Sequence, residues 1–131
     1  MNAVMAVNTI ESSAYALDFA TCEFTDDCVK VCFAEGVNID SDKMLLFYAL
    51  CSEVFTDKPF SVIELRYFSY SVDPLFYIEY RNLLSNIKSH AIVAVTNRLM
   101  YIHQYELDFI KHCPSKAFSA LDDAVEWCLA A

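Results

Sequence analysis

The sequence predicts a single α/β domain built on a mixed, mainly parallel sheet of about five strands, with an N-terminal β-hairpin and about four helices. Short apolar runs typical of buried strands alternate with longer segments whose apolar residues recur at helical spacing. An acidic turn, Asp26-Asp27, divides an alternating segment near the N-terminus into two strands. At 131 residues and 56% hydrophobic, the chain can bury one sizeable core but has no room for a second domain.

The first elements follow in order along the chain. Residues 1–16 show no clear period and are expected to form a loosely ordered lead-in, so the domain is placed at 17–131. In 19–33, Val29, Val31 and Phe33 alternate with Cys28, Lys30 and Cys32, as in a hairpin strand. Asp40 or Ser41 can then cap a helix that continues to Val54.

The second half alternates strands and helices. The apolar run 60–65 and the run 91–95 are typical of buried strands, and a helix is expected between them over 72–87. A third helix should end before Pro114, and a minimal strand, "KAF", precedes a last helix with acidic residues in its first turn. Because right-handed crossovers connect such strands, 60–65 and 91–95 should be adjacent and parallel.

Charge and hydropathy exclude several classes of function. Eighteen acidic residues against nine basic ones give a net charge of −9, which disfavours binding of nucleic acid phosphates. No apolar run approaches the roughly 18–20 residues of a membrane-spanning helix. The N-terminal residues lack the positive charge of a signal peptide, so a cytoplasmic location is expected.

The motifs of common active sites are missing as well. None of the six cysteines forms a C-x-x-C pair and no histidine lies in H-E-x-x-H, so reduced thiols and no metal are expected. One glycine cannot supply a G-x-G-x-x-G or phosphate loop, and no G-x-S-x-G elbow occurs. Cys113 and His112 are neighbours in sequence, which says little about geometry. We therefore expect a protein without catalytic activity or cofactor.

Four segments carry a resemblance to a known family: "VKVCFAEGVNID", "FSVIELRYFSYSVDPLFYIEYRNLL", "HAIVAVTNRLMYI" and "KAFSALDDAVEWCLAA". In this order they resemble the STAS domain superfamily, the SpoIIAA-like fold of anti-sigma-factor antagonists and sulfate-transporter tails. The chain is more closely similar to the short stand-alone STAS-like proteins of Bacteroidetes, over about residues 19–130. The resemblance implies a SpoIIAA-like sheet and a regulatory or signalling role through contact with a protein partner.

Phosphoregulated members of that superfamily carry Asp-Ser-(Ser/Thr)-Gly where the second helix begins. The corresponding text here is "SYSVDP", which lacks the glycine and the Asp-Ser order. Ser71 is the nearest match to the switch hydroxyl and Ser69 the second, so the resemblance makes these two the candidate phosphosites. The alternative for Ser71 is that its hydroxyl only caps the second helix.

The same junction is the expected contact surface. If 60–65 and 91–95 are adjacent parallel strands, the residues that follow each of them meet at one edge of the sheet. Tyr67, Phe68 and Tyr70 there either pack helices onto the sheet or contact a partner or a small apolar ligand. The leading hypothesis is a protein-docking module, which is also expected to form a homodimer, and the alternative is a small-molecule or lipid-binding module. The expected partner-binding residues are Ser69, Tyr70, Ser71, Asp73, Thr96, Asn97 and Arg98.

Overall fold

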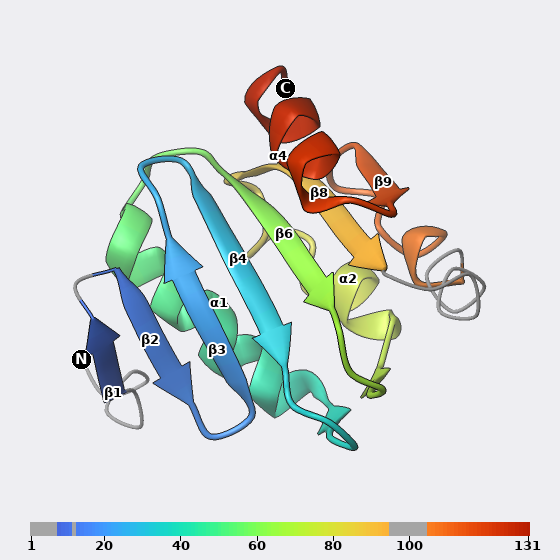
Figure 1. Ribbon diagram of the computed structural model, residues 1–131. Helices are drawn as coiled ribbons and strands as arrows, with labels where there is room; N and C mark the ends of the chain where they lie inside the picture. The colour runs from blue at the N-terminus through green and yellow to red at the C-terminus, as the bar shows by residue number, and fades with distance from the viewer. Residues whose placement is uncertain (1–7, 12, 95–104) are drawn as a thin grey trace.

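The computed structural model describes residues 8–11, 13–94 and 105–131, and it has a mixed sheet with helices on both faces (Figure 1). The α/β class expected from the sequence is confirmed. No helix within these ranges has the length and apolarity needed to cross a membrane. Thr96, Asn97 and Arg98, together with the start of the expected third helix, lie outside the described residues.

The main sheet has seven strands in the described ranges, in the order β1-β2-β3-β4-β6-β8-β9. The pairs from β1 to β4 are antiparallel, and the pairs from β4 through β6 and β8 to β9 are parallel. Strands β1 and β9 therefore form the two edges. The strand bounds are β1 Asn8–Glu11, β2 Ala14–Leu17, β3 Ala20–Phe24, β4 Cys28–Phe33, β6 Phe60–Arg66, β8 Ile87–Ala94 and β9 Ser115–Phe118.

The hairpin and the central parallel pair agree with the sequence-based expectation. β3 and β4 pair around the acidic turn, with Phe24 opposite Val29. β6 and β8 are adjacent and parallel, with Ile63 opposite Ala91. The first helix, α1 Ser41–Phe55, begins as predicted, because Asp40 accepts a hydrogen bond from the Lys43 N–H at 3.0 Å.

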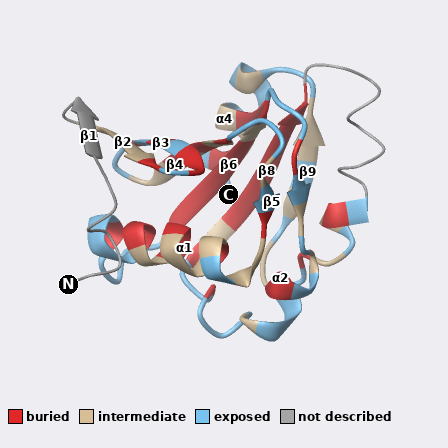
Figure 2. Cartoon of the chain, turned by 90° about the horizontal axis from the view of Figure 1, so that it is seen from below, coloured by how far each residue is buried: buried red, intermediate tan, exposed pale blue. Residues whose placement is uncertain are grey.

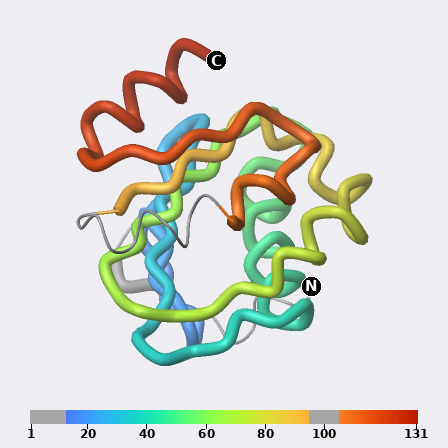
Figure 3. Tube along the Cα trace, turned by 90° about the vertical axis from the view of Figure 1, so that its right-hand side faces the viewer, coloured from blue at the N-terminus to red at the C-terminus, as the bar shows by residue number. Residues whose placement is uncertain are grey.

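Helices cover both faces of the sheet, so the core has two layers, one on each face. Figures 2 and 3 show the arrangement from two directions. On one face lie α1, the short helix α2 Leu75–Glu79 and a two-stranded sheet of β5 Asn38–Ile39 with β7 Ser71–Val72. On the other face, α4 Leu121–Leu129 packs over β6, β8 and β9. Successive residues of a strand point to opposite faces, so Ile63 faces α4 while Val62 and Glu64 face the α1 side.

The expected second helix over 72–87 is wrong in extent, because α2 spans only Leu75–Glu79. Val72 belongs to β7, which pairs with β5, so a helix cannot begin there. After Tyr80 the chain continues in turns, where Asn82, Ser85 and Asn86 favour turn conformations. β8 then begins at Ile87, four positions before the predicted strand start at residue 91.

The N-terminal region also differs from the expectation. A loosely ordered lead-in was expected for 1–16, but β1 lies within that range, β2 begins in it, and both extend the sheet beyond the hairpin. Each has only four residues, which is too short for alternation to stand out in the sequence. The backbone groups of β2 are satisfied by pairing with β3, a contact that local pattern cannot indicate.

Candidate functional site

A group of charged and phenolic side chains is buried at the carboxyl end of β6, on the face covered by α1 and α2. Glu64 and Arg66 are 1% and 2% exposed, and Glu106, from the helical turn 105–107, is 3% exposed. Charged side chains are rarely buried this completely unless they are paired. We call this group the polar cluster; its members are Glu64, Arg66, Tyr70, Tyr77, His90 and Glu106.

Arg66 is the bridge between the two carboxylates. Its Nη2 atom donates to Glu64 Oε2 at 2.6 Å and to Glu106 Oε1 at 2.5 Å. Strand alternation explains the first contact, since residues two apart on β6 point to the same face. The second contact joins positions 40 residues apart in the chain, so only the fold creates it.

Two tyrosines complete the arrangement around the ion pairs. The Tyr70 hydroxyl donates to Glu64 Oε2, and the Arg66 guanidinium lies 4.5 Å from the Tyr70 ring centroid. The Tyr77 hydroxyl, on α2, donates to Glu106 Oε2 at 2.7 Å. The cluster therefore ties together β6, the chain that follows it, α2 and the turn at 105–107.

Burial and mutual charge shift the pKa values of the two carboxyls in opposite directions. Burial raises the pKa of Glu64, but the Arg66 guanidinium together with contacts from His90 and Tyr70 outweighs burial and holds that pKa below its ordinary value. Burial and the adjacent Glu64 carboxylate raise the pKa of Glu106 to about 8, against the opposing effect of Arg66. Because the pKa of Glu106 is about 8, the carboxyl pair retains a proton near neutral pH.

His90 adds an imidazole beside these groups. Its side chain is 1% exposed, and Nε2 lies 3.5 Å from Glu64 Oε1. Glu64, His90 and Glu106 each offer a donor atom, and these three atoms lie within 4.8 Å of one another. Arg66 Nη2 already supplies positive charge to both carboxylates, so the arrangement fits a resident guanidinium better than a metal ion.

Above the cluster, the residues between Arg66 and Tyr70 form a short exposed loop. Tyr67 and Phe68 are 44% and 48% exposed, although the side chains of Arg66 and Tyr70 at the two ends of the loop are buried. The backbone of Ser69 is fixed as well, since its N–H donates to a Glu35 carboxylate oxygen and its C=O accepts from the Gly36 N–H at 2.7 Å. We call residues 67–69 the aromatic loop.

The structure separates the residues that the sequence grouped as one contact surface. Ser69, Ser71 and Asp73 are exposed, whereas Tyr70 is 8% exposed and its hydroxyl points into the polar cluster. Ser71 does not cap α2: it lies in β7, and its hydroxyl donates to Asn38 Oδ1 at 2.7 Å. Asp73 accepts from the Leu75 N–H instead, at 3.1 Å. The three residues 96–98 lie outside the described part of the chain.

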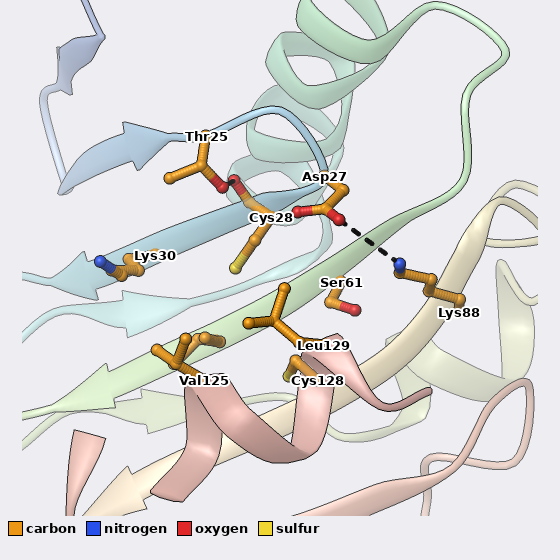
Figure 4. Close-up of a pocket in the computed structure, with 10 residues that line it drawn as sticks. Thr25, Asp27, Cys28, Lys30, Ser61, Lys88, Val125, Cys128 and Leu129 are labelled. Atoms are coloured by element: carbon orange, nitrogen blue, oxygen red, sulfur yellow. Dashed lines mark hydrogen bonds and ion pairs between the residues drawn. The ribbon is translucent and has the colours of Figure 1, made fainter. Parts of the chain in front are cut away.

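At the opposite end of the parallel strands, Cys28 and Cys128 line a small pocket between β4, β6 and the last turn of α4 (Figure 4). The pocket has a volume of about 70 Å³, and Lys88 and Asp27 form an ion pair at its mouth, 3.8 Å apart. Burial, with a smaller effect of Cys128, raises the pKa of Cys28 to about 12. A thiol that stays protonated at neutral pH is a poor nucleophile.

The adjacent His112 and Cys113 show the same behaviour. Burial lowers the pKa of His112 to about 4 and raises the pKa of Cys113 to about 12. Both groups are therefore neutral near pH 7, so they do not form the thiolate–imidazolium pair of cysteine nucleophiles. All six cysteines are free thiols, as predicted.

Sequence reasoning missed the polar cluster, although part of its signal was visible. Glu64 and Arg66 are charges at alternate positions of an otherwise apolar strand, which indicates that both side chains point into the core and need partners. Glu106 lies in a segment whose sequence shows only a helical period.

Comparison with protein-family models, curated proteins and solved structures found no significant match to the chain.

Proposed function

We propose that the protein is a non-enzymatic, STAS-like interaction module of cytoplasmic regulation or signalling that docks a partner protein through the aromatic loop. One observation carries the proposal: Tyr67 and Phe68 are about half exposed, while Arg66 and Tyr70 on either side are anchored in the core. Exposed aromatic side chains are strong contributors to protein interfaces. Their fixed backbone reduces the entropy that is lost on binding.

The surroundings of the loop indicate the chemistry of the partner. Glu35 lies against Ser69, and Asp73 is exposed on the neighbouring backbone, which pairs with the segment after Gly36. The whole chain carries a net charge of −9. A complementary partner would offer an apolar pocket for the two rings and basic residues around it. Serine hydroxyls at 69 and 71, the candidate phosphosites, would add negative charge to this rim if modified.

The experiment is an affinity capture from the native cell with wild-type protein and single variants, quantified by mass spectrometry. Tyr67→Ala and Phe68→Ala should each lower recovery of the partner at least tenfold, and Ser71→Asp should alter it through added charge. Leu129→Ala is the matched control, because Leu129 is 65% exposed on α4, on the other face of the sheet. A captured protein whose recovery is the same with wild type and all variants does not bind through the aromatic loop. If every captured protein behaves in this way, the proposal is rejected.

A second function, binding of a small apolar molecule or lipid at the same junction, is favoured by a different observation. Tyr67 lines a groove of about 390 Å³ together with Leu65, Cys32 and Leu121. That volume lies within the range of small-molecule sites. Titration with a fluorescent fatty acid tests it: saturable binding that is lost in Leu65→Ala and Tyr67→Ala but retained in Phe68→Ala favours this alternative.

A further inference from the structure

The two carboxylates of the polar cluster belong to parts of the fold that are held very differently. Glu64 is on β6, which pairs with β4 on one side and β8 on the other. Glu106 is on the segment 105–110, where the N–H groups of Phe109 and Ile110 donate to carbonyls within the same segment. Within the described part of the chain, movement of Glu106 therefore breaks side-chain contacts, whereas movement of Glu64 would break the sheet.

Side chains attach this segment to the core. Arg66 and Tyr77 donate to the two oxygens of Glu106, at 2.5 and 2.7 Å. Ile110 is buried, and Leu107 and Phe109 pack against the main core. The described contacts of this segment with the core thus include an apolar contact and hydrogen bonds to one carboxyl group.

Protonation sets the charge in this enclosed site. With one proton on the carboxyl pair, Arg66 pairs with the remaining carboxylate; with none, two carboxylates are ionised around the same guanidinium, and Glu106 is 3% exposed to water. Bringing two like charges together away from water is unfavourable. The raised pKa of Glu106, about 8, has the same cause. Among the described residues, the titratable and charged groups facing Glu106 are Tyr48 on α1, Glu64 and Arg66 on β6, Tyr70, Tyr77 on α2 and His90 on β8.

We propose that the Glu64–Arg66–Glu106 group is a proton-controlled latch: the segment 105–110 stays on the core while the carboxyl pair holds a proton and opens when both carboxyls ionise. Glu106 is the moving half, because its ionised carboxylate gains hydration when the segment leaves. Arg66 then remains paired with Glu64, so the sheet and the residues that anchor the aromatic loop stay in place. Opening uncovers the Tyr77 hydroxyl; any effect on partner capture rests on the proposed docking function.

Hydrogen exchange of the isolated protein from pH 6.5 to 9, corrected for intrinsic rates, tests the latch without a partner. Protection of the Phe109 and Ile110 amides should fall about tenfold per pH unit up to the pKa of Glu106 and then level off. It should also be lower than the protection of the Ile63 amide, which exchanges through global unfolding. Glu106→Gln cannot ionise and should remove the pH dependence, whereas the exposed control Glu126→Gln on α4 should retain it.

Constant protection in the wild type, equal protection of Ile63 and Ile110, or the same pH dependence in Glu106→Gln would overturn the latch. If Glu106→Gln does not fold, the carboxyl carbon of Glu106 in the wild type can be titrated by NMR. A midpoint below pH 6 contradicts the proposal, and a midpoint above pH 7 accompanied by loss of protection supports it. Because every measurement uses the chain alone, failure here leaves the docking proposal to be judged by its own capture experiment.

Discussion

Glu64 and Arg66, two positions apart on the central strand β6, form an ion pair of 2.6 Å inside the protein core. The pair lies at the carboxyl end of the strand, and the chain leaves the sheet directly after it. Two buried charges are stable there only because each has a further hydrogen-bond partner, Tyr70 for Glu64 and Glu106 for Arg66. The stability of the fold and the position of the aromatic loop thus depend on the same residues.

Replacing Arg66 should be one of the most damaging single changes. Arg66→Met leaves Glu64 and Glu106 buried without the guanidinium that they share, and we expect a loss of about 3–5 kcal/mol in the free energy of unfolding. The matched control is Lys30→Met, which removes an exposed ion pair with Glu23 and should cost no more than about 1 kcal/mol. Urea denaturation of both variants measures this, and equal losses would contradict a structural role for the buried pair.

Stability should fall as the pH rises from 6.5 to 8. The folded pKa of Glu106, about 8, lies above its ordinary 4.5, so its contribution is complete below pH 4.5 and is lost as the pH rises through about 8. The slope is at most about 1.4 kcal/mol per pH unit. Denaturant titrations should show the fall in wild type and a flat profile in Glu106→Gln; a wild-type profile that rises over this range would refute the assignment.

Below pH 6.5, His112 should act in the opposite direction. Its folded pKa is lowered to about 4 by burial, so its contribution is present above pH 6.5 and decreases as the pH falls toward 4. Gln does not titrate, so His112→Gln removes this contribution and leaves that of Glu106. In this variant the free energy of unfolding should therefore fall with rising pH below 6.5 as well as above it. Denaturant titrations between pH 4.5 and 6.5 compare the two proteins, and parallel profiles would rule out this role.

Ser71 and Asp73 should affect stability by separate routes. Ser71→Ala removes a neutral hydrogen bond to Asn38 and should cost about 0.5–1.5 kcal/mol, with Asn38→Ala similar and the double variant no worse than either. Asp73→Ala removes the acceptor for the Leu75 N–H and should cost about 0.5–2 kcal/mol, adding to the Ser71 effect. Melting curves decide this: if Asp73→Ala has no effect, Asp73 does not stabilise the start of α2.

The thiols should react only when the chain unfolds. Cys22 and Cys51 are buried, and burial raises the pKa of Cys22 to about 12. A thiol reagent at pH 7.5 should modify six cysteines in denaturant, as expected for six free thiols, and should react with Cys22 and Cys51 slowly in the native protein. Fewer than six reactive groups in denaturant would reveal a disulfide.

Self-association is expected from the exposed apolar side chains around α2. Leu75, Ile78 and Leu83 are 50%, 43% and 54% exposed. We expect a homodimer at micromolar concentration, measured by light scattering, and Ile78→Glu should shift it toward monomer. A wild-type monomer at the same concentration would reject this expectation.

The sequence alone determined the elements whose signals are local. The alternation around Asp26-Asp27 specified the hairpin, Asp40 marked the start of α1, and the two apolar runs became the adjacent parallel strands β6 and β8. These features depend on the nearest neighbours in the chain, which periodicity and capping reflect directly.

The tertiary structure decided the rest. It shortened the second helix, since β5 recruits Ser71 and Val72 into a strand, and it turned Tyr70 inward to Glu64. It also brought Glu106 to Arg66 across 40 residues of chain. Such pairings depend on which segments pack against one another in the folded protein. The two carboxylates share one guanidinium only because folding buries them together.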